Sequence, residues 1–305
     1  AAGLVPIAHA ADGMGSIRIP AANCGVVGLK PGAGLVPAEM GVHSWFGMSE
    51  NGPMATTVVD AALMLAVMAG RPELAAVEAP ARRLRVGLAL GVPTPLARLD
   101  AGLRAAAERS ARALADAGHE VVELELPYPA NPLPALARWF AGAGADAEHD
   151  GLELGALEPR VRAHIRAGRV LARFGGLSTA PVDRLRRRML AATEGFDVIL
   201  TPALAQPGPV ADGWHRRSWF ANMRVNIGYA PYAALWNLLG WPAAVVALHR
   251  VAALEPGGFD DEHRDQRGDR DGQDQPDGAD EGADDFLGEF GAGQGVAQRP
   301  LVEHH

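Results

Sequence analysis

The chain of 305 residues lacks several features that would mark other classes of protein. Its single cysteine, Cys24, cannot form an internal disulfide, which fits a reducing compartment. No apolar run reaches the ~18 residues of a membrane-spanning helix, and the first residues carry no pattern of a secretory leader. We therefore expect a cytoplasmic protein without a membrane partner.

Lysine is nearly absent, since Lys30 is the only one among 28 basic residues. The net charge of −8 is also uneven: ten Asp, two Glu and three Arg within residues 259–285 sum to −9, so the remainder sums to +1. Binding of nucleic acid needs a basic stripe, which a nearly neutral body does not favour. The sequence predicts no nucleic-acid partner.

Signatures of metals and nucleotides are missing as well. No pair of histidines or carboxylates has the spacing of metal ligands. Gly13 and Gly15 lack the third glycine and the preceding strand of a dinucleotide-binding fingerprint. We expect neither a metal nor a cofactor.

The patterns that are present predict strands alternating with helices, which favours an α/β fold with a largely parallel sheet. Residues 1–40 are glycine-bounded apolar runs typical of short buried strands. Further strands are expected over 84–90, 121–126 and 196–200, and helices over 58–69, 101–117, most of 132–194, 215–225 and 229–239.

The stretch that carries chemistry reads DGMGSIRIP over residues 12–20. It places a serine, Ser16, behind a loop of small residues, where a carbonyl could approach the main-chain N–H groups. Several N–H groups that converge on one point form an oxyanion hole for acyl transfer. Taken alone, the same nine residues also fit an ordinary glycine-rich turn with a capping serine.

Other residues compete for a role in the site. His9 and Asp12 with Ser16 invite a Ser-His-Asp interpretation, although such triads are recognised by geometry and not by closeness in sequence. Cys24 could be a nucleophile, but its apolar surroundings favour a core thiol. Five aromatic residues could line an acyl pocket, and their helical spacing favours the core instead: Trp219, Phe220, Tyr232, Trp236 and Trp241.

The wider context of Ser16 closely resembles the amidase signature family. The resemblance rests first on AGLVP at 2–6, DGMGSIRIP at 12–20 and CGVVGLKP at 24–31. It continues with GPMA at 52–55, FDV and TP at 196–198 and 201–202, and NL and GWP at 237–238 and 240–242. The resemblance implies an α/β fold in which a mixed, largely parallel β-sheet is covered by helices on both faces, incomplete here.

The resemblance also implies an activity and its residues. Ser16 would attack a carboxylic amide and form an acyl-enzyme, releasing ammonia or an amine before water frees the acid. The N–H groups of Gly13, Met14, Gly15 and Ser16 match the oxyanion loop. Asp12 and Arg18 match a charged pair that we expect to brace it. The substrate would be a small-molecule amide; a homodimer, and an esterase that uses the same serine, stay open.

Three features depart from the family pattern. Met14 stands where the family more often has glycine, and its side chain could crowd the acyl site or tune its specificity. The bridging serine and base lysine of the family's Ser–cis-Ser–Lys triad would fall before Ala1, and Lys30 matches a structural segment instead. We therefore expect residues 1–247 to be a partial amidase domain without its N-terminal part, and a non-catalytic remnant remains an alternative. Residues 248–305 form an acidic, Gly- and Asp-rich tail that we expect to be disordered or out of frame.

Overall fold

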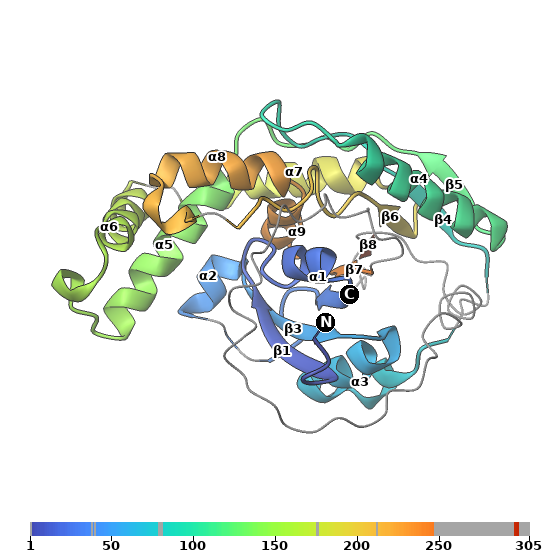
Figure 1. Ribbon diagram of the computed structural model, residues 1–305, viewed down its shortest axis with the longest axis horizontal. Coiled ribbons are helices and arrows are strands. Elements are labelled where there is room, and N and C mark those ends of the chain that lie inside the picture. The colour runs from blue at the N-terminus through green and yellow to red at the C-terminus, as the bar shows by residue number, and fades with distance from the viewer. Residues whose placement is uncertain are drawn as a thin grey trace, which may run out of the picture.

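A computed structural model describes residues 2–37, 39, 41–78, 82–174, 177–211, 213–246 and 296–298. Its centre is one sheet of eight strands in the order β1-β3-β2-β7-β8-β6-β4-β5 (Figure 1). The strands are β1 (Ile7–Asp12), β2 (Val27–Lys30), β3 (Glu50–Ala55), β4 (Arg85–Leu88), β5 (Glu120–Glu123), β6 (Val198–Leu200), β7 (Ala243–Val245) and β8 (Val296–Gln298).

One or more described helices follow each of the first six strands in the chain. They are α1 (Arg18–Cys24), α2 (His43–Gly47), α3 (Val58–Ala69), α4 (Ala101–Asp116), α5 (Leu133–His149), α6 (Pro159–Arg173), α7 (Ala180–Ala192), α8 (Trp219–Tyr229) and α9 (Ala233–Leu239), with the short 3-10 turns η1 (Pro72–Ala75), η2 (Leu154–Ala156) and η3 (Trp214–Arg216). No helix of this described part is both long enough and apolar enough to span a bilayer.

The predicted α/β class and the mixed sheet are confirmed, whereas parallel pairing is less extensive than expected. Strand β4 pairs in parallel with β5 and β6, because α4 and the later helices carry the chain back across the sheet. The ladders β1–β3, β3–β2 and β2–β7 are antiparallel, as are both ladders of β8. The parallel strands therefore form only one end of the sheet, β6-β4-β5.

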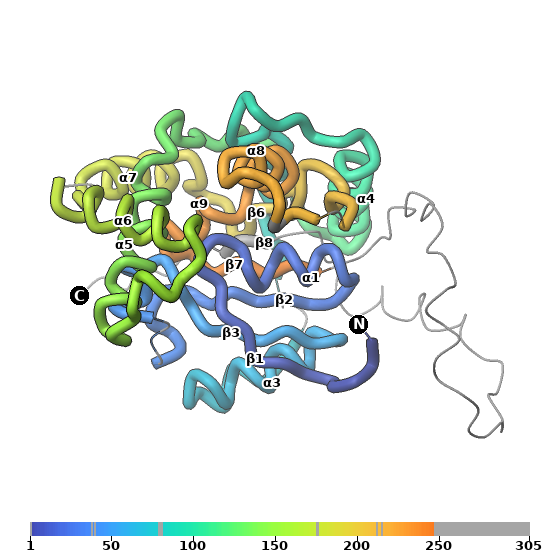
Figure 2. Tube along the Cα trace, turned by 60° about the vertical axis from the view of Figure 1, so that its left-hand side comes forward, coloured from blue at the N-terminus to red at the C-terminus, as the bar shows by residue number. Residues whose placement is uncertain are grey.

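Helices cover both faces of the sheet, as predicted. Side chains alternate along a strand, so neighbouring residues of β2 face opposite ways. Val27 packs with Val58 and Ala61 around α3, whereas Gly28 faces Ala21 of α1 so closely that an added Cβ would lie 2.6 Å from the Ala21 Cβ. Figure 2 shows α1 and α3 on opposite sides of these strands.

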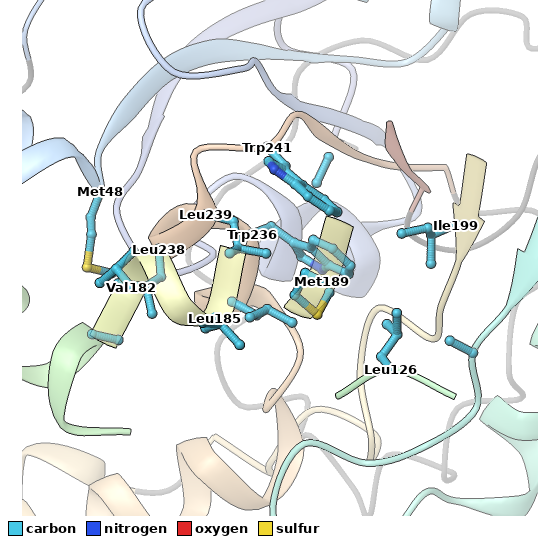
Figure 3. Packing of buried hydrophobic residues seen from close by; sticks show 14 residues of the cluster. Met48, Leu126, Val182, Leu185, Met189, Ile199, Trp236, Leu238, Leu239 and Trp241 are labelled. Carbon is cyan, nitrogen blue, oxygen red and sulfur yellow. The ribbon is translucent and has the colours of Figure 1, made fainter. Parts of the chain in front are cut away.

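The largest apolar cluster joins the parallel and the antiparallel parts of the sheet. Met189 of α7, Ile199 of β6 and Trp236 of α9 meet here with Trp241, which is 1 % exposed (Figure 3). Tyr232, Trp236 and Trp241 are buried, which agrees with the core assignment, whereas Phe220 is 79 % exposed and Trp219 only partly buried. Phe220 therefore contradicts the expectation that all five aromatic residues belong to the core.

Capping residues determine where two of the predicted helices, α3 and α4, begin. The Thr57 hydroxyl accepts from Asp60 N at 3.1 Å where α3 begins. The Asp100 carboxylate accepts from Gly102 N at 2.8 Å and from Leu103 N at 3.1 Å where α4 begins. Side chains of this kind satisfy N–H groups that have no partner within the helix.

Two short helices were not predicted, α1 and α2, and the first of them changes the environment expected for Cys24. Residues 18–24 form α1 and not a strand, because Pro20 lies in the first turn, where it needs no intrahelical N–H bond, and Gly25 ends the helix in a left-handed conformation at φ 68°. Cys24 is the last residue of α1 and is exposed. The expectation of a core thiol is therefore wrong, since it assumed that Cys24 belonged to a buried strand.

The predicted domain boundary at residue 247 stays a prediction. The expectation for the tail 248–305 lies outside the described residues, with the exception of β8, which pairs with β6 and β7.

We expect Asp100→Ala to lower the free energy of unfolding by about 1 kcal/mol, because two N–H groups of α4 lose their acceptor. Urea titration would measure the change. Asp116→Ala, at the exposed C-terminal end of the same helix, is the control and should leave stability within about 0.5 kcal/mol of the parent. Equal losses in both variants would contradict the capping role.

Candidate active site

Ser16 lies in the turn that joins the end of β1 to the start of α1, and it is exposed. Asp12 is the last residue of β1 and Arg18 the first of α1, so the ends of two regular elements hold the turn between them. Asp12 and Arg18 are 0 % and 4 % exposed. The serine therefore stands at the surface above a buried ion pair.

The Asp12 carboxylate is the centre of the hydrogen bonds beneath the turn. Arg18 binds it with two donors, Nε to Oδ2 at 2.9 Å and Nη2 to Oδ1 at 3.0 Å. The amides of Gly15 and Ile17 donate to the same carboxylate at 2.6 and 3.3 Å. Because these amides flank Ser16, the carboxylate fixes the backbone on both sides of the serine.

Asn237 of α9 completes this network. Its Nδ2 lies 2.9 Å from Asp12 Oδ1, 2.8 Å from the Asp12 carbonyl oxygen and 2.9 Å from the Met48 carbonyl oxygen. Its Oδ1 accepts from Arg18 Nη2 at 2.5 Å, and Arg18 Nη1 donates to the Ala233 carbonyl at 3.0 Å. Helix α9 is thereby tied to a turn more than two hundred residues earlier in the chain.

Sequence reasoning gave Asn237 no role in the site. The family resemblance includes NL at 237–238 but gives no partner for Asn237. A second signal was an amide residue within the apolar run AALWNLL of α9, where an unpaired polar group would be costly. That signal indicates a buried partner but does not identify it.

Gly13 and Gly15 lie so close to neighbouring side chains that neither position has room for a Cβ atom. A Cβ on Gly13 would lie 2.6 Å from the ring of Trp45, and one on Gly15 would lie 2.5 Å from the Cβ of Ala233. Gly15 also has φ of 121°, which side chains disfavour. Any larger residue at either position would force the loop away from α2 or α9.

The structure changes the role predicted for Gly15. Its N–H donates to Asp12 and is not free for a substrate carbonyl in this conformation. Gly15 therefore forms the bend of the loop, while Gly13, Met14 and Ser16 stay predicted as oxyanion donors. The Met14 side chain packs against the large apolar cluster.

Lys30 of β2 is fully buried, with Nζ donating to the Pro31 carbonyl at 2.7 Å. Burial, reinforced by the charge of Arg18, lowers the pKa of Lys30 to about 7, although Asp12 and Glu50 favour its charged form. Burial would raise the pKa of Asp12, but Arg18 and Asn237 outweigh it and lower that pKa to about 2. Burial raises the pKa of Glu50.

The positions of His9, Asp12 and Cys24 do not support the competing interpretations of the site. The His9 ring pairs with Asn51 Oδ1 at 3.1 Å, and Asp12 is bound by Arg18, so these two residues do not form a triad with Ser16. Cys24 lies at the opposite end of α1 from Ser16. No cluster of three histidine, cysteine or acidic side chains is placed to hold a metal within the described ranges.

These features define a class of protein: an α/β chain whose exposed serine follows a glycine-rich bend between a strand and a short helix. Family comparison makes the class specific. The amidase family model matches residues 1–259, and the chain belongs to the amidase family.

Individual relatives agree with this membership. A Mycobacterium tuberculosis protein named "Putative amidase AmiB2" is 38 % identical over 255 residues, which cover 81 % of this chain and 55 % of the relative. An acylamidase of Rhodococcus erythropolis is 51 % identical over 70 residues, 23 % of this chain and 15 % of that protein. The chain thus spans about half the length of the curated relatives that match most of it.

A solved structure shares the fold. 6-Aminohexanoate cyclic dimer hydrolase in complex with its substrate aligns with a TM-score of 0.69 at 23 % identity, over 82 % of this chain and 59 % of that one.

We expect Arg18→Met to lower the free energy of unfolding by about 3–5 kcal/mol, because Asp12 would remain buried without its counter-charge. The control is Arg82→Met, which removes a two-donor pair with Asp197 that is largely solvent-exposed and should cost much less. Urea titration of both variants checks the difference, and similar losses would contradict the importance of the buried pair.

Lys30 predicts a pH dependence of stability. Between pH 7 and 10.5 the unfolded chain keeps a proton that folded Lys30 has released. The free energy of unfolding should therefore rise with pH in this window, by about 1.4 kcal/mol per pH unit. Urea titrations from pH 7 to 9.5 would measure it. Because Lys30 is the only lysine, Lys30→Met should abolish the rise, and an unchanged slope in this variant would exclude Lys30 as its source.

Proposed function

We propose that Ser16 is the nucleophile of an amide hydrolase. Its Oγ attacks the amide carbonyl, the carbonyl oxygen becomes an oxyanion, and collapse of this intermediate breaks the C–N bond. The nitrogen leaves as ammonia or an amine with the proton that came from Ser16, and water then hydrolyses the acyl-enzyme to the acid. The substrate is a small-molecule amide, and we place the reaction in the cytoplasm.

The observation that supports this proposal best is that Asp12, paired with Arg18, accepts hydrogen bonds from the turn around Ser16. Hydrogen bonds to Asp12 fix the backbone before and after the serine without using the Gly13, Met14 or Ser16 amides. Donors that are already held in place lose little free energy to reorganisation when the oxyanion forms, which is the main benefit of such a site. Asp12 and Arg18 act here as positioning residues.

The proton acceptor for Ser16 is a separate matter. Lys30 is the only lysine in the sequence, and its ammonium is buried and bonded to the Pro31 carbonyl. It cannot reach a substrate at the exposed Ser16. Lys30 is therefore not the base lysine that the family resemblance implies. This observation favours the second candidate, a chain that keeps the nucleophile and its loop but does not turn over amides by itself.

The proposal predicts that a serine-directed fluorophosphonate labels the chain, and that Ser16→Ala removes the label. Ser178→Ala, a change at another exposed serine, is the control and should leave labelling unchanged. Mass spectrometry of the labelled peptide identifies the site. A folded chain that takes no label, or that labels equally well without Ser16, would contradict the proposal.

Hydrolysis assays with paired amides and esters separate the remaining alternatives. Release of acid from both supports the amide hydrolase. Turnover of esters alone indicates an esterase. Labelling without turnover of either indicates the non-catalytic alternative.

A further inference from the structure

Two tyrosines near the candidate site have buried hydroxyl groups without a partner. The Tyr128 and Tyr232 hydroxyl oxygens make no hydrogen bond with any group that the structure describes. Tyr232 is 2 % exposed. A buried hydroxyl that forms no hydrogen bond costs about 1–3 kcal/mol, so such groups are rare outside functional sites.

Both tyrosines lie where the parallel strands end. Tyr128 follows β5, and its ring lies beside Gly91, which follows β4; an added Cβ there would be 3.6 Å from Tyr128 Cε2. Tyr232 packs with Ala97, also after β4, and with Ala205, which follows β6. Open α/β sheets bind ligands beyond the carboxyl ends of their parallel strands. Both side chains therefore pack against segments that follow the parallel strands, the part of such a sheet where a ligand is expected.

The same region adjoins the Ser16 turn. Tyr232 directly precedes Ala233, whose carbonyl accepts from Arg18 and whose side chain limits the space at Gly15. Tyr128 packs against the same apolar cluster as Met14. Tyr232 also lines a small cavity of about 20 Å³ together with Arg18 and Thr201. The tyrosine pair and the serine turn thus share one neighbourhood, built from segments far apart in the sequence.

The electrostatics of this region fit a neutral ligand group. Burial raises the pKa of Tyr232 to about 12, and burial together with the nearby Tyr232 raises the pKa of Tyr128, so both phenols keep their protons at neutral pH. Arg18 is already bound to Asp12, and Arg104, which acts on Tyr232, lies 3.9 Å from Glu108. Each phenol can donate one hydrogen bond and accept another.

We propose that Tyr128 and Tyr232 form a polar subsite that selects amides carrying a second, neutral hydrogen-bonding group, such as a hydroxyl or another amide. The subsite rests on the proposed function, because it is defined relative to a substrate at Ser16. It makes the two tyrosines specificity-determining residues. A site built to bond a polar group disfavours an analogue that lacks it, because its own hydroxyls then stay unpaired.

The test measures binding and does not need turnover. Calorimetry is done with a series of ω-hydroxyalkanamides and N-(hydroxyalkyl)acetamides, each paired with the amide in which methyl replaces the hydroxyl. The proteins are the full chain, Tyr128→Phe, Tyr232→Phe and the control Tyr229→Phe. Tyr229 is a half-buried tyrosine whose hydroxyl bonds with Asn23.

We expect the full chain to prefer the hydroxylated member of at least one pair by about tenfold or more. The preference should fall to about unity in Tyr128→Phe and Tyr232→Phe and persist in Tyr229→Phe. The proposal is overturned if no pair is discriminated, or if the preference survives both substitutions. A loss of thermal stability without any change in preference also overturns it, since it would mean that the hydroxyls serve the fold alone.

The same titrations in Ser16→Ala separate this proposal from the proposed function. A full chain that fluorophosphonate does not label, but whose preference persists there and in Ser16→Ala, supports the subsite and contradicts the nucleophile. Labelling at Ser16 without any preference contradicts the subsite only.

Discussion

The buried ion pair of Asp12 and Arg18 is the interaction on which the rest of the site depends. Two charges taken out of water are tolerated only when further hydrogen bonds satisfy their remaining atoms. Here the Gly15 and Ile17 amides and Asn237 supply those bonds to Asp12, and the Ala233 carbonyl accepts from Arg18. The requirement to satisfy one carboxylate thus shapes the serine turn and fixes helix α9 against it.

A second constraint acts on the loop from α2. Four successive residues without glycine, His43 to Phe46, have positive φ angles of 46° to 56°, a conformation that costs L-residues free energy. Asp146 of α5 holds this segment, accepting from Val42 N at 2.6 Å and from Trp45 Nε1 at 2.8 Å. The Trp45 ring is thereby pressed against Gly13. The loop before Ser16 is therefore bounded by α2 at Gly13 and by α9 at Gly15.

Local signals in the sequence were sufficient where the cause is local. Helices α3 and α4 follow from Thr57 and Asp100, whose capping oxygens bond to amides two or three residues away. Helix α1 and the exposure of Cys24 were missed, because a short apolar run bounded by glycine fits a strand as well as a helix. The extent of parallel pairing was overestimated for a related reason: it depends on which strands meet, and not on the pattern within each strand.

The sequence by itself determined the family, the serine turn and the α/β class, because these follow from contiguous residues. It also determined that Lys30 is the only lysine. Only the tertiary structure decided what surrounds that turn: the place of Asn237 beneath it, the use of the Gly15 amide by Asp12, the burial of Lys30, and the two tyrosine hydroxyls beyond the strand ends. The physical reason is that a hydrogen bond depends on distance in space, and these partners are brought together by packing of the sheet and its helices.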